Sequence, residues 1–414
     1  MFRIATSQSF DAGIERIQQR QIDMSQAQER LTSGKRVARA SDDPTAAARA
    51  ERALASIERN AASQRAVDAS RNAMTLSESA LGDAGDLLQQ ANEALVAGGN
   101  GSYSDAERAV IADNLAAIRK QLLAVANRGD GEGGFLFSGQ GASQPPFVDA
   151  AGGVVFRGTA GEVPVATDEP LQRTVDGQAA WLASPNGNGL FATRNAATTP
   201  NSSGTWIDAG RVTDPQAFYA ATSPPAVANP AALTYRVDFT STPGGSTFTV
   251  LKDGAATSLT NAPYVSGQAI EIDGMAFTIA GTPAAGDAFE LKLATPSLGV
   301  FDALDRTIAE LKTPLRSSAA VTQTVQKGLA DLQGSMAALQ SLRSRVGEAL
   351  NRADMVDGRI ASLTVAAKAE RSNAEDLDMV QAISEFQNQQ SGYEAALKTY
   401  SSVQRMSLFQ YLNV

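Results

Sequence analysis

Carboxylates, hydroxyls and amines are the only groups with which this chain could do acid–base or nucleophilic chemistry, because its 414 residues include neither histidine nor cysteine. A Ser–His–Asp or Cys–His nucleophile therefore cannot be built, and neither can a zinc site of cysteine and histidine ligands. Disulfides are excluded for the same reason. The 44 acidic residues could supply a catalytic carboxylate pair, but no spacing nominates one. We therefore expect a protein that is not an enzyme, with no catalytic residue, no metal site and no cofactor.

Three charged clusters are the remaining candidates for ligand binding. Residues 127–133 have the composition of a calcium loop but lack the ligand spacing of an EF-hand, so a turn is favoured. The acidic run 375–378 and the pair Asp42-Asp43 stand where helices are expected to begin, and carboxylates there stabilise the helix dipole. We expect all three clusters to shape the backbone rather than to bind ligands.

Net charge and apolar runs limit the possible partners. A net charge of -9 argues against broad contact with nucleic acid or with acidic membranes. No run approaches the roughly 20 apolar residues of a membrane span, and the start of the chain lacks the apolar stretch of a secretory signal. Taken alone, this predicts a cytoplasmic protein.

The distribution of proline divides the chain into three parts. Of 16 prolines, 14 lie between Pro145 and Pro296. Proline interrupts helices and is tolerated in turns and at strand edges. The sequence therefore predicts helical flanks around a turn-rich centre.

Heptad spacing predicts long helices in the N-terminal flank. A helix from Pro44 to about Leu95, capped by Asp43, presents large apolar residues every seventh position and small residues between them. These positions are Val67, Met74, Leu81, Leu88 and Leu95, with Ser70, Ser77, Ala84 and Ala91. A capping box at Ser104 and Glu107 opens another helix, which we expect to end near Gly129.

The C-terminal flank has matching periodicity. A short amphipathic helix over 301–311 is ended by Pro314, and a second apolar seam runs from Leu332 to Leu363. Packing of this seam against the long N-terminal helix would give an antiparallel rod made from both chain ends. An ordinary helical bundle without an assembly role is the alternative.

Both extreme termini keep the heptad but place glutamine at some seam positions, among them Gln21, Gln28 and Gln390. Such a seam is marginal in an isolated helix and favours packing against other chains. The assembly interface is predicted to comprise Ile14, Ile17, Met24, Leu31, Met379, Ile383, Phe386, Tyr393, Leu397, Tyr400, Leu408, Phe409 and Leu412.

Short alternating strands characterise the centre. Tyr235, Val237 and Phe239 alternate with polar residues, and Asp273-Gly274 is a hairpin signal. The pattern predicts a small sandwich or barrel, while 198–232 has no assignable structure. The expected fold class is α+β: a terminal coiled-coil region (1–43 and 375–414), a helical rod (44–140 and 297–374) and a variable, mainly β domain (141–296).

Three stretches resemble the flagellin superfamily. Residues 29–44, with Thr32-Ser33-Gly34-Lys35 and Asp42-Asp43-Pro44, are similar to its N-terminal signature. Residues 134–139 (Gly-Phe-Leu-Phe-Ser-Gly) are similar to the exit from its third helix. The third stretch, 382–412, contains Gly392-Tyr393-Glu394-Ala395-Ala396-Leu397-Lys398. The resemblance covers roughly the first 140 and the last 115 residues.

Within this superfamily, residues 135–139 and 393–398 resemble the branch at the hook–filament junction more than filament flagellin, which is the alternative. The resemblance implies a structural subunit that forms a homo-oligomeric ring. Its expected partners are the first hook-associated protein, flagellin and an export chaperone that binds within about 375–414, with neither nucleic acid nor membrane among them.

The same resemblance implies type III export to the cell exterior without a cleaved signal peptide, which replaces the cytoplasmic expectation. A carboxylate hydrolase in the β domain is a remote alternative, and an adhesin or type III translocator fits the heptads but not the three stretches.

Overall fold

The computed structural model describes residues 6–165, 169–196, 204–223, 229–242 and 245–412, without the side chains of 6–10, 231, 242 and 403–412. The chain divides into two compact units: 1–65 with 356–414, and 66–355. We call them the terminal unit and the bundle unit. No helix in the described part of the chain is both long and apolar enough to cross a membrane.

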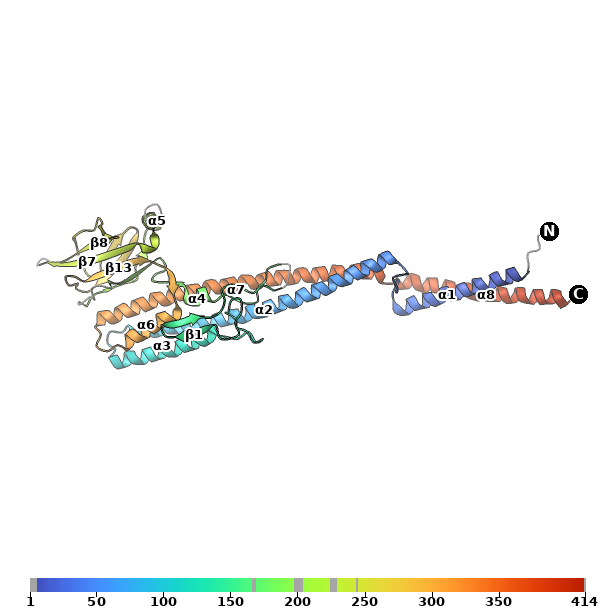
Figure 1. The fold of residues 1–414 in the computed structure, drawn as a ribbon, viewed down its shortest axis with the longest axis horizontal. Coiled ribbons are helices and arrows are strands. Elements are labelled where there is room, and N and C mark those ends of the chain that lie inside the picture. Colours follow the sequence, from blue (N-terminus) through green and yellow to red (C-terminus); the bar gives the residue numbers. More distant parts are fainter. Residues whose placement is uncertain (1–5, 166–168, 197–203, 224–228, 243–244, 413–414) are drawn as a thin grey trace. The chain divides into compact units, whose positions relative to one another are not determined.

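Helices come from both ends of the chain, as the heptad spacing predicts (Figure 1). In chain order the helices are α1 (Thr6–Ser33), α2 (Pro44–Gly98), α3 (Asp105–Ala126), α4 (Gln178–Leu182), α5 (Pro215–Thr222), the 3-10 helix η1 (Pro230–Ala232), α6 (Val300–Lys312), α7 (Ser318–Glu375) and α8 (Met379–Leu412). The start of α3 is set by the predicted capping box, in which the Ser104 hydroxyl accepts from the Glu107 amide and the Glu107 side chain accepts from the Ser104 amide.

The bundle unit buries the predicted heptad seam. The five large seam residues of α2, from Val67 to Leu95, are each at most 2 % exposed. Four of them, Met74, Leu81, Leu88 and Leu95, share one core with residues of α3 and α6 and with Leu339 of α7. Since burying one leucine side chain contributes about 2 kcal/mol, this core is the main stabilising element of the unit.

Small residues let the helices of the bundle unit approach closely. Ser70, Ser77, Ala84 and Ala91 are all at most 1 % exposed. The Ser77 hydroxyl donates to the Ala73 carbonyl of its own helix at 2.8 Å, so its burial leaves no polar group unpaired. On α7, a Cβ at position 328 would lie 2.6 Å from Leu95, which explains the glycine there despite its low helix propensity.

An aromatic cluster closes one side of the bundle core. Trp181 of α4 stacks on Phe301 of α6 with ring centroids 5.9 Å apart, and Phe137 and Phe147 meet Trp181 edge-on. Phe147 opens the hairpin of β1 (Phe147–Ala150) and β2 (Gly153–Phe156). The sequence patterns did not predict this cluster, because its rings come from four separate segments.

Two antiparallel sheets form the β-rich part of the bundle unit. Their strands are β4 (Phe191–Asn195), β7 (Thr234–Thr242), β8 (Gly245–Lys252), β9 (Ala255–Ala256), β10 (Ala262–Pro263) and β13 (Ala288–Leu293) in one sheet, and β5 (Trp206–Ile207), β6 (Arg211–Val212), β11 (Ala269–Ile272) and β12 (Met275–Ala280) in the other. The remaining strands pair as β1 (Phe147–Ala150) with β2 (Gly153–Phe156), and β3 (Ser184–Pro185) with β14 (Pro296–Leu298).

One apolar core joins the two larger sheets, as the predicted sandwich requires. Tyr235, Val237 and Phe239 are buried in this core beside Ile270 and Phe277. Asp273 and Gly274 form the predicted two-residue hairpin between β11 and β12, with φ of 48° and 76°. Both central residues therefore have the positive φ that a type I′ turn requires.

Part of the segment 198–232, which the sequence patterns left unassigned, has regular secondary structure. Asp214 caps α5 by accepting from the amides of Gln216 and Ala217 at 2.9 and 3.0 Å. Residues 198–203 and 224–228 of that segment lie outside the described residues.

The prediction that the α7 seam continues to Leu363 is wrong. Leu363 is 51 % exposed, whereas Ile360 is buried. After Ile360 the covered positions continue at Thr364, Ala367 and Ala374. The seam therefore contains two consecutive four-residue steps, a stutter that rotates the covered face and turns Leu363 toward solvent.

Candidate assembly interface

The first and last helices of the chain form an antiparallel pair (Figure 1). A Cβ at Gly13 would lie 3.5 Å from the Tyr400 ring, and a Cβ at Gly392 would lie 2.5 Å from the Arg20 guanidinium. Because the partner number falls as the chain number rises, α1 and α8 run in opposite directions. The two termini of the chain thus share one two-helix layer.

The face that α8 turns toward α1 contains part of the predicted seam and also residues next to it. Ala382 is buried, and Phe386, Gln389, Tyr393 and Ala396 are half-buried. Alternating spacings of four and three connect these positions, which is the coiled-coil repeat. The contact face therefore uses small residues at 382 and 396, one position before the larger residues that the sequence analysis selected.

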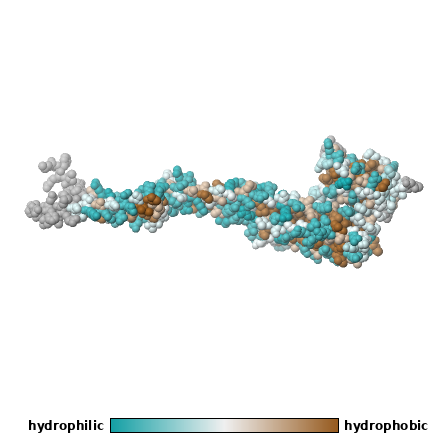
Figure 2. Space-filling view, turned by 180° about the vertical axis from the view of Figure 1, so that it is seen from behind, coloured by the Kyte–Doolittle hydropathy of each residue, from teal (hydrophilic) through white to brown (hydrophobic). Residues whose placement is uncertain are grey.

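Large apolar residues beside that face remain uncovered. Met379 and Ile383 are each 46 % exposed, Leu397 is 40 % exposed, and on α1 Ile14 is 41 % exposed. Figure 2 shows a hydrophobic patch on this stretch of the molecule, within a mostly hydrophilic surface. Two helices cannot enclose a full apolar seam, so covering it requires a further partner.

Outcomes differ among the thirteen predicted interface residues. Ile17, Met24, Leu31, Phe386, Tyr393 and Tyr400 are partly covered within the α1–α8 pair. Ile14, Met379, Ile383 and Leu397 are exposed. The side chains of Leu408, Phe409 and Leu412 lie outside the described residues. The assignment of all thirteen to an interface between chains stays a prediction.

Two exposed residues of this surface escaped the sequence analysis. Ile22 is 50 % exposed and Val380 is 82 % exposed. Neither occupies an a or d position of the heptad, so a periodicity search passes over them. A search for apolar residues off the seam would have found both.

Backbone hydrogen bonds join the two helix breaks next to the pair. α1 ends at Ser33, and Gly34 has a φ of 71° and donates to the Arg30 carbonyl. The Arg36 amide donates to the Glu375 carbonyl at 2.7 Å, and the Leu377 amide donates to the Gly34 carbonyl at 2.9 Å. We call residues 34–43 and 375–378, held together in this way, the elbow.

Charged side chains complete the elbow. Arg36 donates to the Ala374 carbonyl at 2.8 Å and to Asp43 at 3.2 Å. Lys35 and Arg371 pair with Glu375 at 3.3 and 2.8 Å. Glu375 is the last residue of α7 and not the start of a helix, so the expectation of a dipole-stabilising carboxylate was wrong for this residue, which makes ion pairs instead.

Asp43 links the elbow to the start of α2. Its carboxylate accepts from the Ala46 amide at 3.0 Å and from the Thr45 hydroxyl at 2.8 Å. The Ala46 amide, then the Thr45 hydroxyl and then Arg36 lower the pKa of Asp43 to about 2. The cap therefore remains charged far into acid.

A groove of about 380 Å³ lies between α1 and the start of α8. It is lined by Asp23, Gln26, Ala27, Arg30, Arg36, Leu377, Asp378, Gln381, Ala382, Glu385 and Gln389. Within the described part of the chain, the buried Oε1 of Gln389 accepts no hydrogen bond. Leaving a buried acceptor unpaired costs free energy. A ligand in the groove that donates a hydrogen bond to this oxygen would therefore be favoured.

The other charged clusters form turns and caps. Asp130 accepts from the amides of Glu132 and Gly134, both at 2.8 Å, as a turn residue does. Asp378 accepts from the Val380 amide at 3.0 Å and caps α8. Among the residues that the structure describes, no group of three or more Asp or Glu side chains could hold a metal ion.

Comparisons with known families match both ends of the chain. The bacterial flagellin N-terminal helical region matches residues 4–142, and the bacterial flagellin C-terminal helical region matches residues 329–412. These matches of 139 and 84 residues together cover more than half of the 414 residues. Together the two matches include the α1–α8 pair and the elbow.

Flagellar hook-associated proteins are similar to this chain in sequence and in fold. The flagellar hook-associated protein 3 of Salmonella typhimurium is 24% identical over 99% of each chain. The crystal structure of flagellar hook-associated protein 3 from Legionella pneumophila is similar with a TM-score of 0.69 and 26% identity, over 77% of this chain and 97% of that one. The crystal structure of FlgL from Xanthomonas campestris is similar with a TM-score of 0.66 and 26% identity, over 78% of this chain and 99% of that one.

Proposed function

Because the chain belongs to the bacterial flagellin family, we propose that it is a structural subunit of the flagellum that forms the junction between hook and filament. The observation that carries this proposal is the full-length match to flagellar hook-associated protein 3, which extends through the β-rich centre. Flagellin-type terminal helices alone would fit a filament subunit equally well. The fold likeness to solved junction proteins supports the same choice.

Assembly proceeds through the terminal helices, in our proposal. Residues 1–43 and 375–414 carry the contacts between chains, 44–140 with 297–374 form the helical rod, and 141–296 form the variable domain. The exposed Ile14, Met379, Ile383 and Leu397 support this division, because they are apolar residues that one chain leaves uncovered. Copies of the chain in a ring would bury them and offset the ordering entropy of the terminal helices.

Proposed partners follow from the junction role. The chain contacts other copies of itself, the first hook-associated protein on the hook side and flagellin on the filament side. A flagellar export chaperone covers the C-terminal region before assembly, and the chain reaches the cell exterior by type III export without signal cleavage. The uncovered apolar surface of α8 supports a chaperone, because such a surface promotes aggregation in a free chain.

No enzymatic role is proposed, since the relatives are structural proteins. The remote alternative, a hydrolase in the β domain, requires two converging carboxylates. The cavity between the β-rich part and the helices has one carboxylate among its lining residues, Asp331. This arrangement gives the hydrolase no support.

The decisive experiment compares attachment with export. We expect a strain lacking this protein to release flagellin into the medium without attached filaments. A truncated chain of residues 1–374 should keep its bundle unit folded. It should nevertheless fail to restore filaments. Restoration by that truncated chain would contradict assembly through the terminal helices.

A point variant gives a finer test. Ile383→Ser should reduce filament attachment, because it removes an exposed apolar contact without opening a cavity. The matched control is Val110→Ser, which changes a residue 68 % exposed on α3. Equal effects of both substitutions would argue against the terminal surface. Flagellin, the alternative function, predicts instead that the purified chain polymerises into long filaments.

A further inference from the structure

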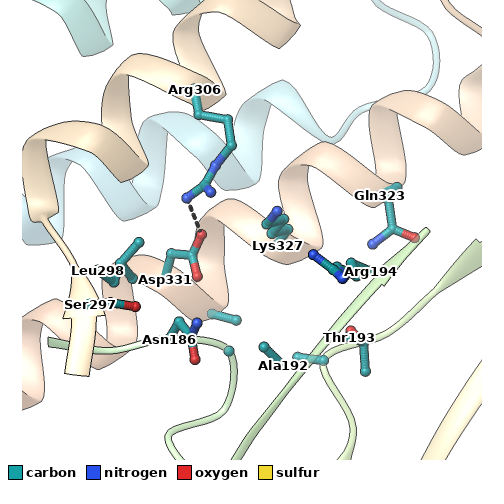
Figure 3. A pocket seen from close by; sticks show the side chains of 13 residues that line it. Asn186, Ala192, Thr193, Arg194, Ser297, Leu298, Arg306, Gln323, Lys327 and Asp331 are labelled. Atoms are coloured by element: carbon teal, nitrogen blue, oxygen red, sulfur yellow. Dashed lines mark hydrogen bonds and ion pairs between the residues drawn. The ribbon is translucent and has the colours of Figure 1, made fainter. Parts of the chain in front are cut away.

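A polar cavity of about 240 Å³ lies in the bundle unit where the chain passes between its helices and its β-rich part (Figure 3). The outgoing chain contributes Asn186 and Arg194, and the returning chain contributes Ser297. Helices α6 and α7 supply the opposite wall. We call it the crossover cavity. None of its residues belongs to the terminal surface described above.

Cations outnumber carboxylates around this cavity. Arg194, Arg306 and Lys327 line it together with one acidic residue, Asp331. Arg306 pairs with the buried Asp331 at 2.9 Å, and Arg194 pairs with Glu290 at 2.6 Å. With both arginines neutralised, the charge of Lys327 is left over.

Lys327 has no ion-pair or hydrogen-bond partner among the residues that the structure describes. It lies half-buried on α7, and Figure 3 shows it between Arg194 and Asp331. Burial lowers the pKa of Lys327, and the charges of Arg306 and Arg194 lower it further, whereas the carboxylates of Asp331 and Glu310 oppose these effects. Placing a negative charge near its ammonium would remove this penalty.

Two side-chain amides add further donors. The Oδ1 of Asn186 accepts from the Thr295 amide at 3.1 Å, and the Oε1 of Gln323 accepts from the Ile207 amide at 2.7 Å. These bonds fix which end of each amide is the oxygen. The amino groups of Asn186 and Gln323 have no partner among the described residues.

We propose that the crossover cavity binds a small oxyanion, a carboxylate or phosphate, held by Lys327 and by the amino groups of Asn186 and Gln323. The free groups are donors and the unmatched charge is positive, so the complementary ligand is an acceptor-rich anion. The volume equals about eight water molecules at roughly 30 Å³ each, which suits a small ion rather than a polypeptide. A cation would meet three positive side chains and is disfavoured.

Binding would connect segments that only the fold brings together. Asn186 lies in the chain entering the β-rich part, and Gln323 and Lys327 lie on α7. An anion held by all three reduces local opening there, because it binds only the closed arrangement. The proposal does not depend on the flagellar role of the chain.

Calorimetric titration of the full chain at neutral pH tests the proposal, with inorganic phosphate in one arm and succinate in the other. Sodium chloride at matched ionic strength is the reference. We expect saturable binding of at least one of the two anions and weakening of that binding by at least tenfold in Lys327→Met. Lys120→Met, which removes the same charge from an exposed site on α3, should bind as the unmodified chain does.

A second variant guards against misfolding of the first. Gln323→Glu keeps an acceptor for the Ile207 amide but replaces the free donor with a negative charge, so it should also weaken binding by at least tenfold. Hydrogen exchange of the unmodified chain should show added protection at 186–194 when the anion is present. The proposal is overturned if neither anion binds beyond the chloride reference, or if both variants bind as the unmodified chain does.

Discussion

The bundle unit and the terminal unit are both built on heptad repeats, but the apolar heptad residues are buried in the first and partly exposed in the second. In the bundle unit, seam residues such as Met74, Leu88 and Leu115 are fully buried. In the terminal unit, Ile383 and Leu397 keep 46 % and 40 % of their surface exposed. The terminal unit comprises less than a third of the chain but carries eight of the sixteen large apolar residues that are exposed among those described.

The number of packed elements explains this difference. In the bundle unit α3, α6 and the cluster around Trp181 surround the α2–α7 seam, so each knob finds a closed hole. In the terminal unit, α1 and α8 pack against each other and leave Ile383 and Leu397 exposed. A single chain therefore completes the first core and leaves the second incomplete.

The largest expected effect tests the completeness of the bundle core. Leu88→Ala should lower the free energy of unfolding by about 3 kcal/mol, because it opens a cavity in a closed core. Urea unfolding followed by helical circular dichroism measures this loss. A loss near zero would show that the core is loosely packed.

The same kind of substitution in the terminal pair should cost far less. Ile383→Ala is expected to change the stability of the isolated chain by less than about 1 kcal/mol, because nearly half of the side chain is already in water. Urea unfolding of both variants under the same conditions gives the contrast. Similar losses for Leu88→Ala and Ile383→Ala would break the comparison between the units.

Two glycines of the terminal unit should respond with opposite sign. Gly34→Ala should destabilise by about 1 kcal/mol, because φ there is 71° and an L residue is strained in that region. Gly358→Ala should stabilise by roughly 0.5 to 1 kcal/mol, since that glycine is exposed within α7 and has open space around it. Thermal unfolding of both variants measures the pair, and equal signs would contradict the elbow geometry.

Ion pairs between helices should contribute little even in the bundle unit. Arg343 and Glu78 join α7 to α2 at 2.9 Å, but both side chains are well exposed to solvent. Arg343→Met should therefore reduce stability by less than about 1 kcal/mol. A loss as large as that of Leu88→Ala in the same urea assay would assign the bundle's stability to charge rather than to its core.

The elbow has a distinct pH response. The pKa of Asp43 is lowered to about 2 from 3.8, so its contribution to stability is fully present above about pH 4 and disappears as the pH falls toward 2. Titration of its carboxyl carbon by NMR should give a midpoint near 2, and a midpoint near 3.8 would contradict the cap. Asp43→Asn retains a capping side chain and should remove this part of the acid dependence.

Local sequence predicted the elements that depend on near neighbours. The capping box at Ser104, the cap at Asp43 and the Asp273-Gly274 turn are confirmed by their hydrogen bonds or dihedral angles. The heptad seam from Val67 to Leu95 is confirmed as buried, because its period places it on one helix face.

Predictions that depended on a distant partner were less accurate. Leu363 follows the heptad but is exposed, since the covered face shifts after Ile360. On α8 the side facing α1 includes Ala382 and Gln389, next to Ile383 and Gln390 of the predicted seam, whose packing against other chains stays a prediction. Periodicity predicts which side of a helix is covered only to within one residue position. The shape of the partner helix then decides which of two adjacent residues is covered.

The sequence by itself determined the helical ends, the β-rich centre and the family, because these depend on periodicity, turn chemistry and local motifs. Tertiary structure alone decided which apolar residues remain uncovered, how the elbow joins 34–43 to 375–378, and which charges meet in the crossover cavity. Arg194 and Lys327 are 133 positions apart and become neighbours only when the β-rich part folds back onto α7. Proximity between remote segments is a property of the packed chain, and no local pattern encodes it.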